Sequence, residues 1–359
     1  FPILQNDEPY LTNLKLTKQE NLALSIDKEL RHAYRGGWTY LKKGYEGKEY
    51  ENVVVYDVNS LYPYVMSENI FPFGAPIITH DLEEITGYSL FIIAFECEFW
   101  LKEGKLPTIQ IKNSQLFNGR EYLENSKSEI VNLTLTSVDY EMFLEHYFKV
   151  HKVYYFRGTE NLFTEFIQKW AAVKEKAGRE GNNGLRFISK QMQNSTYGKF
   201  ATNPLKSQKI PYLENNILRF QTMAPEFRPE YYLPVGLFVT AYARKHIISY
   251  AQRNYDSFIY CDTDSLHLKE KSDNIPLDNE KLGYFKIEKE FDRARYIRAK
   301  RYIGEKDGEL LITCAGLPAK CYEQVTYDNF KTGQIYTGKL MLTQTEGGAV
   351  LIETTFNLK

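Results

Sequence analysis

The chain has 359 residues, which is enough to bury a large core and to form more than one subdomain. With 43% hydrophobic and 25% charged residues, its composition is that of a folded protein and excludes a largely disordered chain. The formal net charge of −1 argues against a surface that is basic throughout, so any nucleic-acid site must be local.

The compartment is predicted from the cysteines and the apolar stretches. Four cysteines show neither the spacing of a zinc site nor the density of a disulfide scaffold, which favours a reducing compartment. The N-terminal FPILQNDEPYL does not resemble a signal peptide, and the longest apolar stretch, SLFIIAFECEFW, is too short and too charged to cross a bilayer. We therefore expect a cytoplasmic protein without a membrane partner.

The first half of the chain reads as a helix, a turn, a strand and a mixed module. Residues 15–34 have helical periodicity, and YRGG (34–37) predicts a turn. ENVVVYDVNS (51–60) predicts a buried strand whose polar end is Asp57. Residues 75–160 alternate β-rich runs with one helix, which indicates an inserted α+β module.

The second half begins with a helical period at Asn161. GREGNNG (178–184) interrupts this period before a second helix from residue 185 to about 199, so we expect an antiparallel helical hairpin. Residues 205–230 predict a loop or a small β element, and a further helix follows. SFIYCDTDSLHL (257–268) predicts a β-hairpin, and short strands and loops are expected after it.

Three carboxylates mark the candidate site. Asp262 and Asp264 alternate along a strand and so point to the same side, although such a pair alone is more often an exposed turn. Asp57 ends a second apolar strand, so two strands are expected to bring acid to one sheet edge. Hard oxygen ligands favour Mg²⁺ or Mn²⁺, and two such ions suit phosphoryl displacement. A single metal on a nucleotide-sugar diphosphate is the alternative.

Cations are grouped in two other places. Arg186, Lys190, Asn194 and Tyr197 share one helix face, where two cations a turn apart suit a triphosphate, although a solvated surface is the alternative for the cations alone. The stretch KEFDRARYIRAKRYIG (289–304) interleaves basic and aromatic residues, which suits contact with a nucleic-acid backbone and its bases. A solvated face is again the alternative.

Four motifs in order resemble those of the family B DNA polymerases, and most of all their protein-primed branch. These are DVNSLYP (57–63), KQMQNSTYG (190–198), YCDTDS (260–265) and KRY (300–302). YRGG (34–37), TAYAR (240–244) and CAG (314–316) also resemble that branch. The resemblance covers essentially the whole chain, and four ordered motifs are far more specific than any one of them.

The resemblance implies an α+β fold, the right-hand polymerase fold of palm, fingers and thumb with two insertions of the protein-primed branch. The implied segments are the palm at 1–74 and 227–314, a first insertion at 75–160, the fingers at 161–202, a second insertion at 203–226 and the thumb at 315–359. It also implies a DNA-directed DNA polymerase that extends a primer 3'-OH with dNTPs by a two-metal mechanism, using Mg²⁺ with Mn²⁺ as a substitute.

The same resemblance assigns roles to residues. Asp57 and Asp264 would be the principal metal ligands, with Asp262 and the carbonyl of Val58 assisting. Tyr62 would fill the space of a ribose 2'-OH. The other implied nucleotide-binding residues are Ser60, Leu61, Lys174, Arg186, Lys190, Asn194 and Tyr197. The implied DNA and primer contacts are Tyr34, Gly36, Gly37, Asn59, Ser195, Gly198, Lys199, Phe200, Thr240, Arg244, Thr263, Ser265, Lys300 and Tyr302.

The implied partners are template and primer DNA, dNTPs and a terminal protein that supplies the first priming hydroxyl. We expect a monomer that displaces strands, in the host cytoplasm if a phage encodes it. Arg186 stands where the family pattern has lysine, and Thr196 where it has leucine. Little sequence precedes YRGG, so we expect no 3'-5' exonuclease and weaker strand displacement.

Two other classes remain open from the residues alone. A manganese-dependent glycosyltransferase would use the DTD of residues 262–264 on a nucleotide sugar, but it leaves NSTYG (194–198) and KRY unexplained. A catalytically inactive nucleic-acid-binding or replication-scaffold protein would not need Asp57, Asp262, Asp264 and Lys190 together. Primer extension discriminates among the three.

Overall fold

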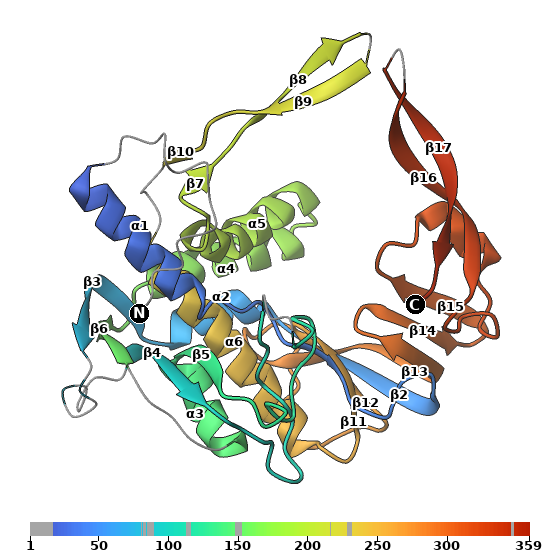
Figure 1. The fold of residues 1–359 in the computed structure, drawn as a ribbon. Helices are drawn as coiled ribbons and strands as arrows, with labels where there is room; N and C mark the ends of the chain where they lie inside the picture. The colour runs from blue at the N-terminus through green and yellow to red at the C-terminus, as the bar shows by residue number, and fades with distance from the viewer. Residues whose placement is uncertain are drawn as a thin grey trace.

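The structure is a computed structural model that describes residues 17–79, 81, 84, 90–112, 116–147, 153–215, 217–227, 232–345 and 348–359. Its centre is a seven-stranded antiparallel sheet with the strand order β1-β11-β12-β2-β13-β14-β15 (Figure 1). The strands are β1 (Thr39–Leu41), β2 (Glu49–Val58), β11 (Phe258–Asp262), β12 (Ser265–Leu268), β13 (Phe285–Arg298), β14 (Arg301–Lys306) and β15 (Glu309–Cys314). The predicted β11–β12 hairpin is confirmed.

The central strand β2 forms because its middle is a run of buried β-branched residues, Val53 to Val55. One face of the sheet packs against helix α6 (Leu233–Arg253), which is buried along most of its length, and against α2 (Leu61–Glu68), which begins directly after β2. A second cluster is formed by side chains of the sheet strands themselves and includes Tyr260, Tyr296 and Tyr302. Burial on both faces holds the ends of β2 and β11 in fixed positions.

A second sheet with the order β3-β6-β4-β5 packs with helix α3. Its elements are β3 (Phe71–Thr79), β4 (Leu90–Cys97), β5 (Val131–Thr136), α3 (Ser137–His146) and β6 (Val153–Thr159). This agrees with the α+β module predicted from the sequence. The expected boundary at residue 74 falls inside β3, which pairs with β6 from Phe71 onward.

The predicted helical hairpin is present as α4 (Thr164–Arg179) and α5 (Asn183–Phe200). The helix expected at residues 15–34 is α1 (Lys18–Arg31), and residues 15 and 16 lie outside the described part. Arg31 joins the end of α1 to the end of α5, because its guanidinium donates to the carbonyl oxygens of Ala201 and Thr202. Across the described ranges, no helix is long and apolar enough to span a bilayer.

Two extended hairpins project from the body of the molecule (Figure 1). One is β8 (Lys209–Glu214) with β9 (Ile217–Thr222), carried on the short pair β7 (Leu205–Lys206) and β10 (Glu226–Phe227). The other is β16 (Ile335–Thr345) with β17 (Gly348–Asn357), which follows the 3-10 helix at Ala319–Gln324. Strand β9 approaches both β16 and β17, so the two hairpins meet across the molecule.

The expectation of only short strands and loops after residue 268 was wrong. Strand β13 has 14 residues, and β16 and β17 have 11 and 10. The stretch that becomes β13, FKIEKEFDRARYIR, is too rich in charge to be recognised as a strand by local pattern. It is held in the sheet because it pairs with β2 along most of its length, and this partner is more than 200 positions away in sequence.

Candidate active site

The candidate site lies where the β11–β12 turn meets the end of β2. Ser265 is paired with Asp262 across the hairpin and with Asp57 on β2. The backbone N–H of Val58 donates to the carbonyl of Asp264 at 2.9 Å, which fixes the turn against β2. Three acidic residues from two separate segments therefore lie at one end of the sheet.

The turn between the two aspartates is tightly constrained. Thr263 has a φ of 64°, an unusual conformation for a β-branched residue, and its N–H donates to the carbonyl of Trp38 at 2.9 Å. A Cβ placed on Gly37 would lie 2.6 Å from Thr263 Cγ2. The glycine of the YRGG turn is therefore required for the close approach of this turn to the acidic hairpin.

The electrostatics of the site show an excess of negative charge at Asp264. Burial raises the pKa of its carboxyl to about 6, and the neighbouring charges of Asp57, Asp262 and Glu288 add to this effect. Among the residues that the structure describes, the carboxylate has a hydrogen bond from its own backbone N–H and no ion pair with a basic side chain. The arrangement therefore favours binding of a cation.

The other two aspartates are held by lysines. Lys286 Nζ lies 2.9 Å from Asp57 Oδ1, and Lys300 Nζ lies 3.0 Å from Asp262 Oδ1. Asp262 also accepts a hydrogen bond from Thr39 Oγ1 at 3.0 Å. Within the described ranges, no three His, Cys, Asp or Glu side chains converge as a ready-made metal cage. The three aspartates are neighbours, but two of them point to ammonium groups.

The donor chemistry of the site fits a hard divalent cation. Its acidic side chains offer only oxygen ligands, and burial and acidic neighbours raise the pKa of Asp264. Asp57 and Asp264, with Asp262 beside them, are the residues that could hold Mg²⁺ or Mn²⁺. The proposed contribution of Val58 is limited to its backbone carbonyl, because its side chain is buried in the core.

The start of α2 forms the neighbouring wall. Ser60 takes a left-handed conformation, with φ 51° and ψ 56°, at the cap position of α2. Its hydroxyl accepts a hydrogen bond from Lys174 Nζ on α4 at 2.9 Å. Burial lowers the pKa of Lys174, and the charges of Lys190, Arg186 and Lys286 lower it further. Four cations thus share one region, which suits a polyanion.

The aromatic residues expected at the nucleotide are in contact. The rings of Tyr62 on α2 and Tyr197 on α5 are stacked, with centroids 4.2 Å apart and planes 21° apart. Asn194 is partly exposed on α5, whereas Arg186 and Lys190 are exposed. The side chain of Leu61 is buried, so it supports α2 and leaves only its backbone for a ligand. Two helices from distant segments thus form one wall of the site.

A large hollow of about 1220 Å³ opens beside the acidic hairpin. It is lined by the YRGG turn at Gly36 and Gly37 and by the β13–β14 turn at Lys300. Its basic lining residues are Lys43, Lys112, Arg120, Lys127, Arg298, Lys300 and Arg301. The basic stretch of residues 289–304 is thus divided, because Arg293 and Arg295 are paired with Glu305 and Glu49 on the sheet.

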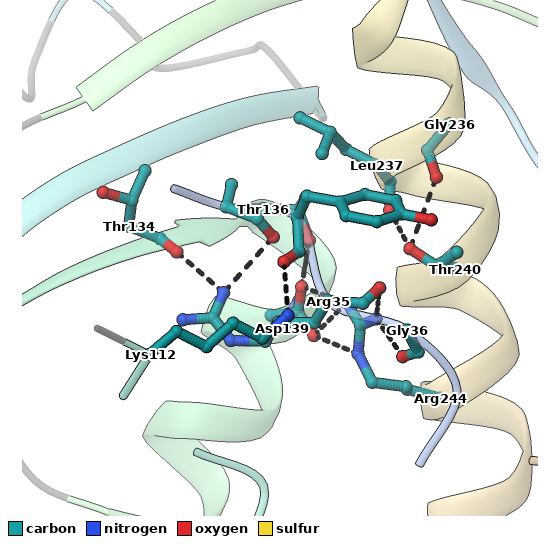
Figure 2. Close-up of polar contacts among 12 residues, drawn as sticks. Arg35, Gly36, Lys112, Thr134, Thr136, Asp139, Gly236, Leu237, Thr240 and Arg244 are labelled. Carbon is teal, nitrogen blue, oxygen red and sulfur yellow. Dashed lines mark hydrogen bonds and ion pairs between the residues drawn. The ribbon is translucent and has the colours of Figure 1, made fainter. Parts of the chain in front are cut away.

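Three side chains expected to contact DNA or the primer, Arg244, Thr240 and Tyr302, are buried in this structure. Arg244 is 1% exposed and bonds to Asp139 and to the carbonyls of Arg35 and Gly36 (Figure 2). Thr240 is 1% exposed and donates to carbonyls of its own helix. Tyr302 is buried among aromatic rings. These buried side chains therefore have a structural role in holding the site.

The remaining residues expected at DNA lie at several depths. Asn59 is tied by its backbone and side chain to the loop that ends at Tyr284, and Phe200 packs edge-on against Phe163. Tyr34 is partly buried against the main core. The exposed members on α5 are Ser195, Gly198 and Lys199. These three residues are exposed, as contact with DNA requires.

Three residues near the aspartates were missed from the sequence. Thr39 reaches Asp262, Lys286 reaches Asp57, and Glu288 contributes to the raised pKa of Asp264. Lys286 and Glu288 belong to the alternating KIEKE of β13, whose pairing with β2 is a long-range feature. The local alternation of charge does not give the faces of this strand, because the register shifts between Ile287 and Lys289, and Glu290 then pairs with Val54 on the opposite face from Asp57.

Comparison with known proteins places these features in a family. Residues 10–281 match the family model described as DNA polymerase type B, organellar and viral. The chain is 42% identical to the DNA polymerase of Bacillus phage B103, over 94% of this chain and 63% of the relative, and 37% identical to that of Streptococcus phage Cp-1, over 85% and 56%.

The structural comparison agrees with the sequence comparison. The solved structure of phi29 DNA polymerase complexed with primer-template DNA and incoming nucleotide superposes with a TM-score of 0.86 at 41% identity, over 94% of this chain and 63% of that one. The chain thus spans 56 to 63% of the length of these phage relatives. The α+β polymerase fold is confirmed, and the chain belongs to the organellar and viral type B DNA polymerases.

Proposed function

We propose that the chain is a DNA-directed DNA polymerase that transfers nucleotides from dNTPs to a primer 3'-OH. The observation that carries the proposal is the position of Asp57 beside the Asp262–Asp264 hairpin, with the cations Lys174, Arg186 and Lys190 grouped near Ser60 at the start of α2. Acidic oxygens and a group of cations are what a metal-bound triphosphate requires. The phage relatives named above are DNA polymerases, which supports the same activity.

Each group has a proposed role. Asp57 and Asp264 hold Mg²⁺, or Mn²⁺ in its place, with help from Asp262 and the carbonyl of Val58. Two bound ions would lower the pKa of the primer hydroxyl and stabilise the leaving pyrophosphate. Lys174, Arg186 and Lys190 neutralise the triphosphate. Asn194 and Tyr197 line the base pair, and Tyr62 excludes the ribose 2'-OH.

The domain assignment is part of the proposal. The central sheet with α2 and α6 is assigned to the palm (1–74 and 227–314), and the hairpin of α4 and α5 to the fingers (161–202). The β8–β9 hairpin falls in the proposed second insertion (203–226), and β16–β17 in the proposed thumb (315–359). The contact between these hairpins would help to enclose DNA and so favour strand displacement.

Priming by a protein is also proposed. The resemblance to the protein-primed branch assigns its insertions to residues 75–160, which include β4 to β6, and to residues 203–226, which include the β8–β9 hairpin. The partners are then template and primer DNA, dNTPs and a terminal protein, with a monomeric chain acting in the cytoplasm of a host cell. A terminal protein that acquires a nucleotide on one hydroxyl in the presence of this chain would support this step.

Primer extension with Mg²⁺ and the four dNTPs tests the proposal. Wild-type chain should lengthen the primer, and Asp264→Asn should abolish extension while DNA binding persists. Asp256→Asn is the control, because Asp256 is exposed and lies before β11. No extension by the wild type under conditions where it binds primer-template would overturn the proposal and favour a non-catalytic binding protein.

A further inference from the structure

The ion pair between Lys286 and Asp57 lies at the centre of the proposed metal site. Lys286 is the direct cross-strand partner of Asp57 in the pairing of β13 with β2. Its Nζ lies 2.9 Å from Asp57 Oδ1, and the two side chains are 39% and 22% exposed. The other cross-strand partner of Asp57 is Ser265, which carries no charge. Lys286 is therefore the cation that the sheet register itself supplies to Asp57.

The surroundings of this pair are unusual for a surface salt bridge. Asp264, Asp262 and Glu288 add negative charge on one side. On the other side Lys286 is close enough to the cations of the fingers hairpin to help lower the pKa of Lys174. The ammonium group thus pairs with one of the grouped aspartates and lies near the cation Lys174. Such a position suits a cation that neutralises Asp57 when no divalent ion is bound.

The same pair bears on how the aspartates are arranged. In the described part of the chain they are not gathered into a metal cage, and Asp57 points to Lys286. A divalent ion at Asp57 would meet a positive charge already bonded to one carboxylate oxygen. Because like charges a few ångströms apart repel, the ion and the ammonium group cannot both remain there without cost.

We propose that Lys286 is a built-in counterion that competes with a divalent cation for Asp57 and leaves the carboxylate when the cation binds. The inference rests on the proposed function, because it takes Asp57 as a metal ligand. It assigns Lys286 a regulatory role: the free chain keeps Asp57 neutralised, and metal affinity is lower than the carboxylates alone would give. Lys286 is thus a positioning residue for the metal site.

Manganese binding to the full 359-residue chain, without DNA or nucleotide, tests this directly by electron paramagnetic resonance. Lys286→Met keeps much of the aliphatic stem and removes the charge. We expect Mn²⁺ to bind about three- to fivefold more tightly, the scale of a partly exposed ion pair. Lys286→Arg keeps the charge and should bind Mn²⁺ like the wild type. Lys286→Gln provides a second neutral variant if the methionine variant does not fold.

The matched control is Lys271→Met. Lys271 Nζ lies 2.9 Å from Glu290 Oε1, so it forms a similar pair with the same strand β13. Its removal should leave Mn²⁺ affinity unchanged. Unchanged or weaker binding in the neutral Lys286 variants would overturn the proposal, and so would an equal gain in Lys271→Met, which would indicate a general field effect.

The two proposals fail in different ways. Absence of primer extension by the wild type would overturn the polymerase function, whereas the manganese measurement uses no primer, template or nucleotide. Tighter Mn²⁺ binding in Lys286→Met would then still support competition at Asp57. Conversely, if the chain is an active polymerase and its Mn²⁺ affinity does not change in the neutral Lys286 variants, the proposed function stands and the counterion proposal fails.

Discussion

The guanidinium of Arg244 and the carboxylate of Asp139 form a buried ion pair with three hydrogen bonds of 2.7 to 3.0 Å. The side chains are 1% and 6% exposed. Arg244 lies on α6 under the central sheet, and Asp139 lies on α3 of the second sheet. Since Arg244 also donates to the carbonyls of Arg35 and Gly36, it joins both sheets to the YRGG turn (Figure 2).

We predict that Arg244→Ala lowers the free energy of unfolding by about 3 to 5 kcal/mol, because it leaves a buried carboxylate without its partner. Urea unfolding followed by circular dichroism measures this. The control is Lys245→Ala, since Lys245 pairs with Glu141 between the same two helices but both side chains are about half exposed. That change should cost less than about 1 kcal/mol. If the two variants lose the same free energy of unfolding, the buried pair does not stabilise the fold more than the exposed pair.

Asp139 gives this pair a pH dependence. Burial alone would raise the pKa of its carboxyl, but the charge and hydrogen bonds of Arg244 and the charge of Arg35 lower it below its ordinary value of 3.8. A depressed pKa contributes stability that is present above the unfolded value and is lost as the pH falls through the folded value. The stability difference between wild type and Asp139→Asn should therefore be constant above about pH 5 and shrink below about pH 4. A difference that does not change down to pH 3 would oppose this assignment.

Gly37 gives a test of how the YRGG turn supports the acidic hairpin. A Cβ at Gly37 would lie 2.6 Å from Thr263 Cγ2 and 2.8 Å from its Oγ1. Gly37→Ala should therefore displace the residue between Asp262 and Asp264 and lower the rate of primer extension at least about tenfold, since small misplacements of reacting groups are costly. Steady-state extension on one primer-template measures the effect.

The rescue experiment uses the strained turn itself. Thr263→Gly removes the clashing atoms and suits a residue with a φ of 64°. The double variant Gly37→Ala with Thr263→Gly should recover most of the activity of Thr263→Gly alone. If the double variant is no better than Gly37→Ala, the contact with Thr263 is not the cause of the loss.

The sequence predicted the parts of this site that depend on local pattern. The valine run of β2, the alternation around Asp262 and Asp264 and the period of α4 and α5 each follow from neighbouring residues. The partners of these groups depend on register between distant strands. Lys286 contacts Asp57 only because β13 pairs with β2, and no local pattern within β13 predicts that pairing.

Burial of Arg244 was unpredictable for the same reason. TAYAR lies on a predicted helix, and the family resemblance implied that its arginine contacts DNA or the primer. Its actual partner, Asp139, is 105 positions away and belongs to the other sheet. The sequence thus located the chemical groups at the site, whereas the structure was needed to separate the side chains that face the site from those that hold it in place.

The stacked pair of Tyr62 and Tyr197 supplies the last prediction, on sugar selectivity. The rings lie 4.2 Å apart, so Tyr62 is held by Tyr197 as well as by its own helix. Under the proposed function, Tyr62→Val should open the space of a 2'-OH and reduce the preference for dNTPs over ribonucleotides about 10- to 100-fold, measured as the ratio of kcat/KM values. Tyr62→Phe keeps the ring and should keep the preference. If Tyr62→Val preserves it too, the ring does not contact the sugar, and the exclusion of ribonucleotides must come from another side chain.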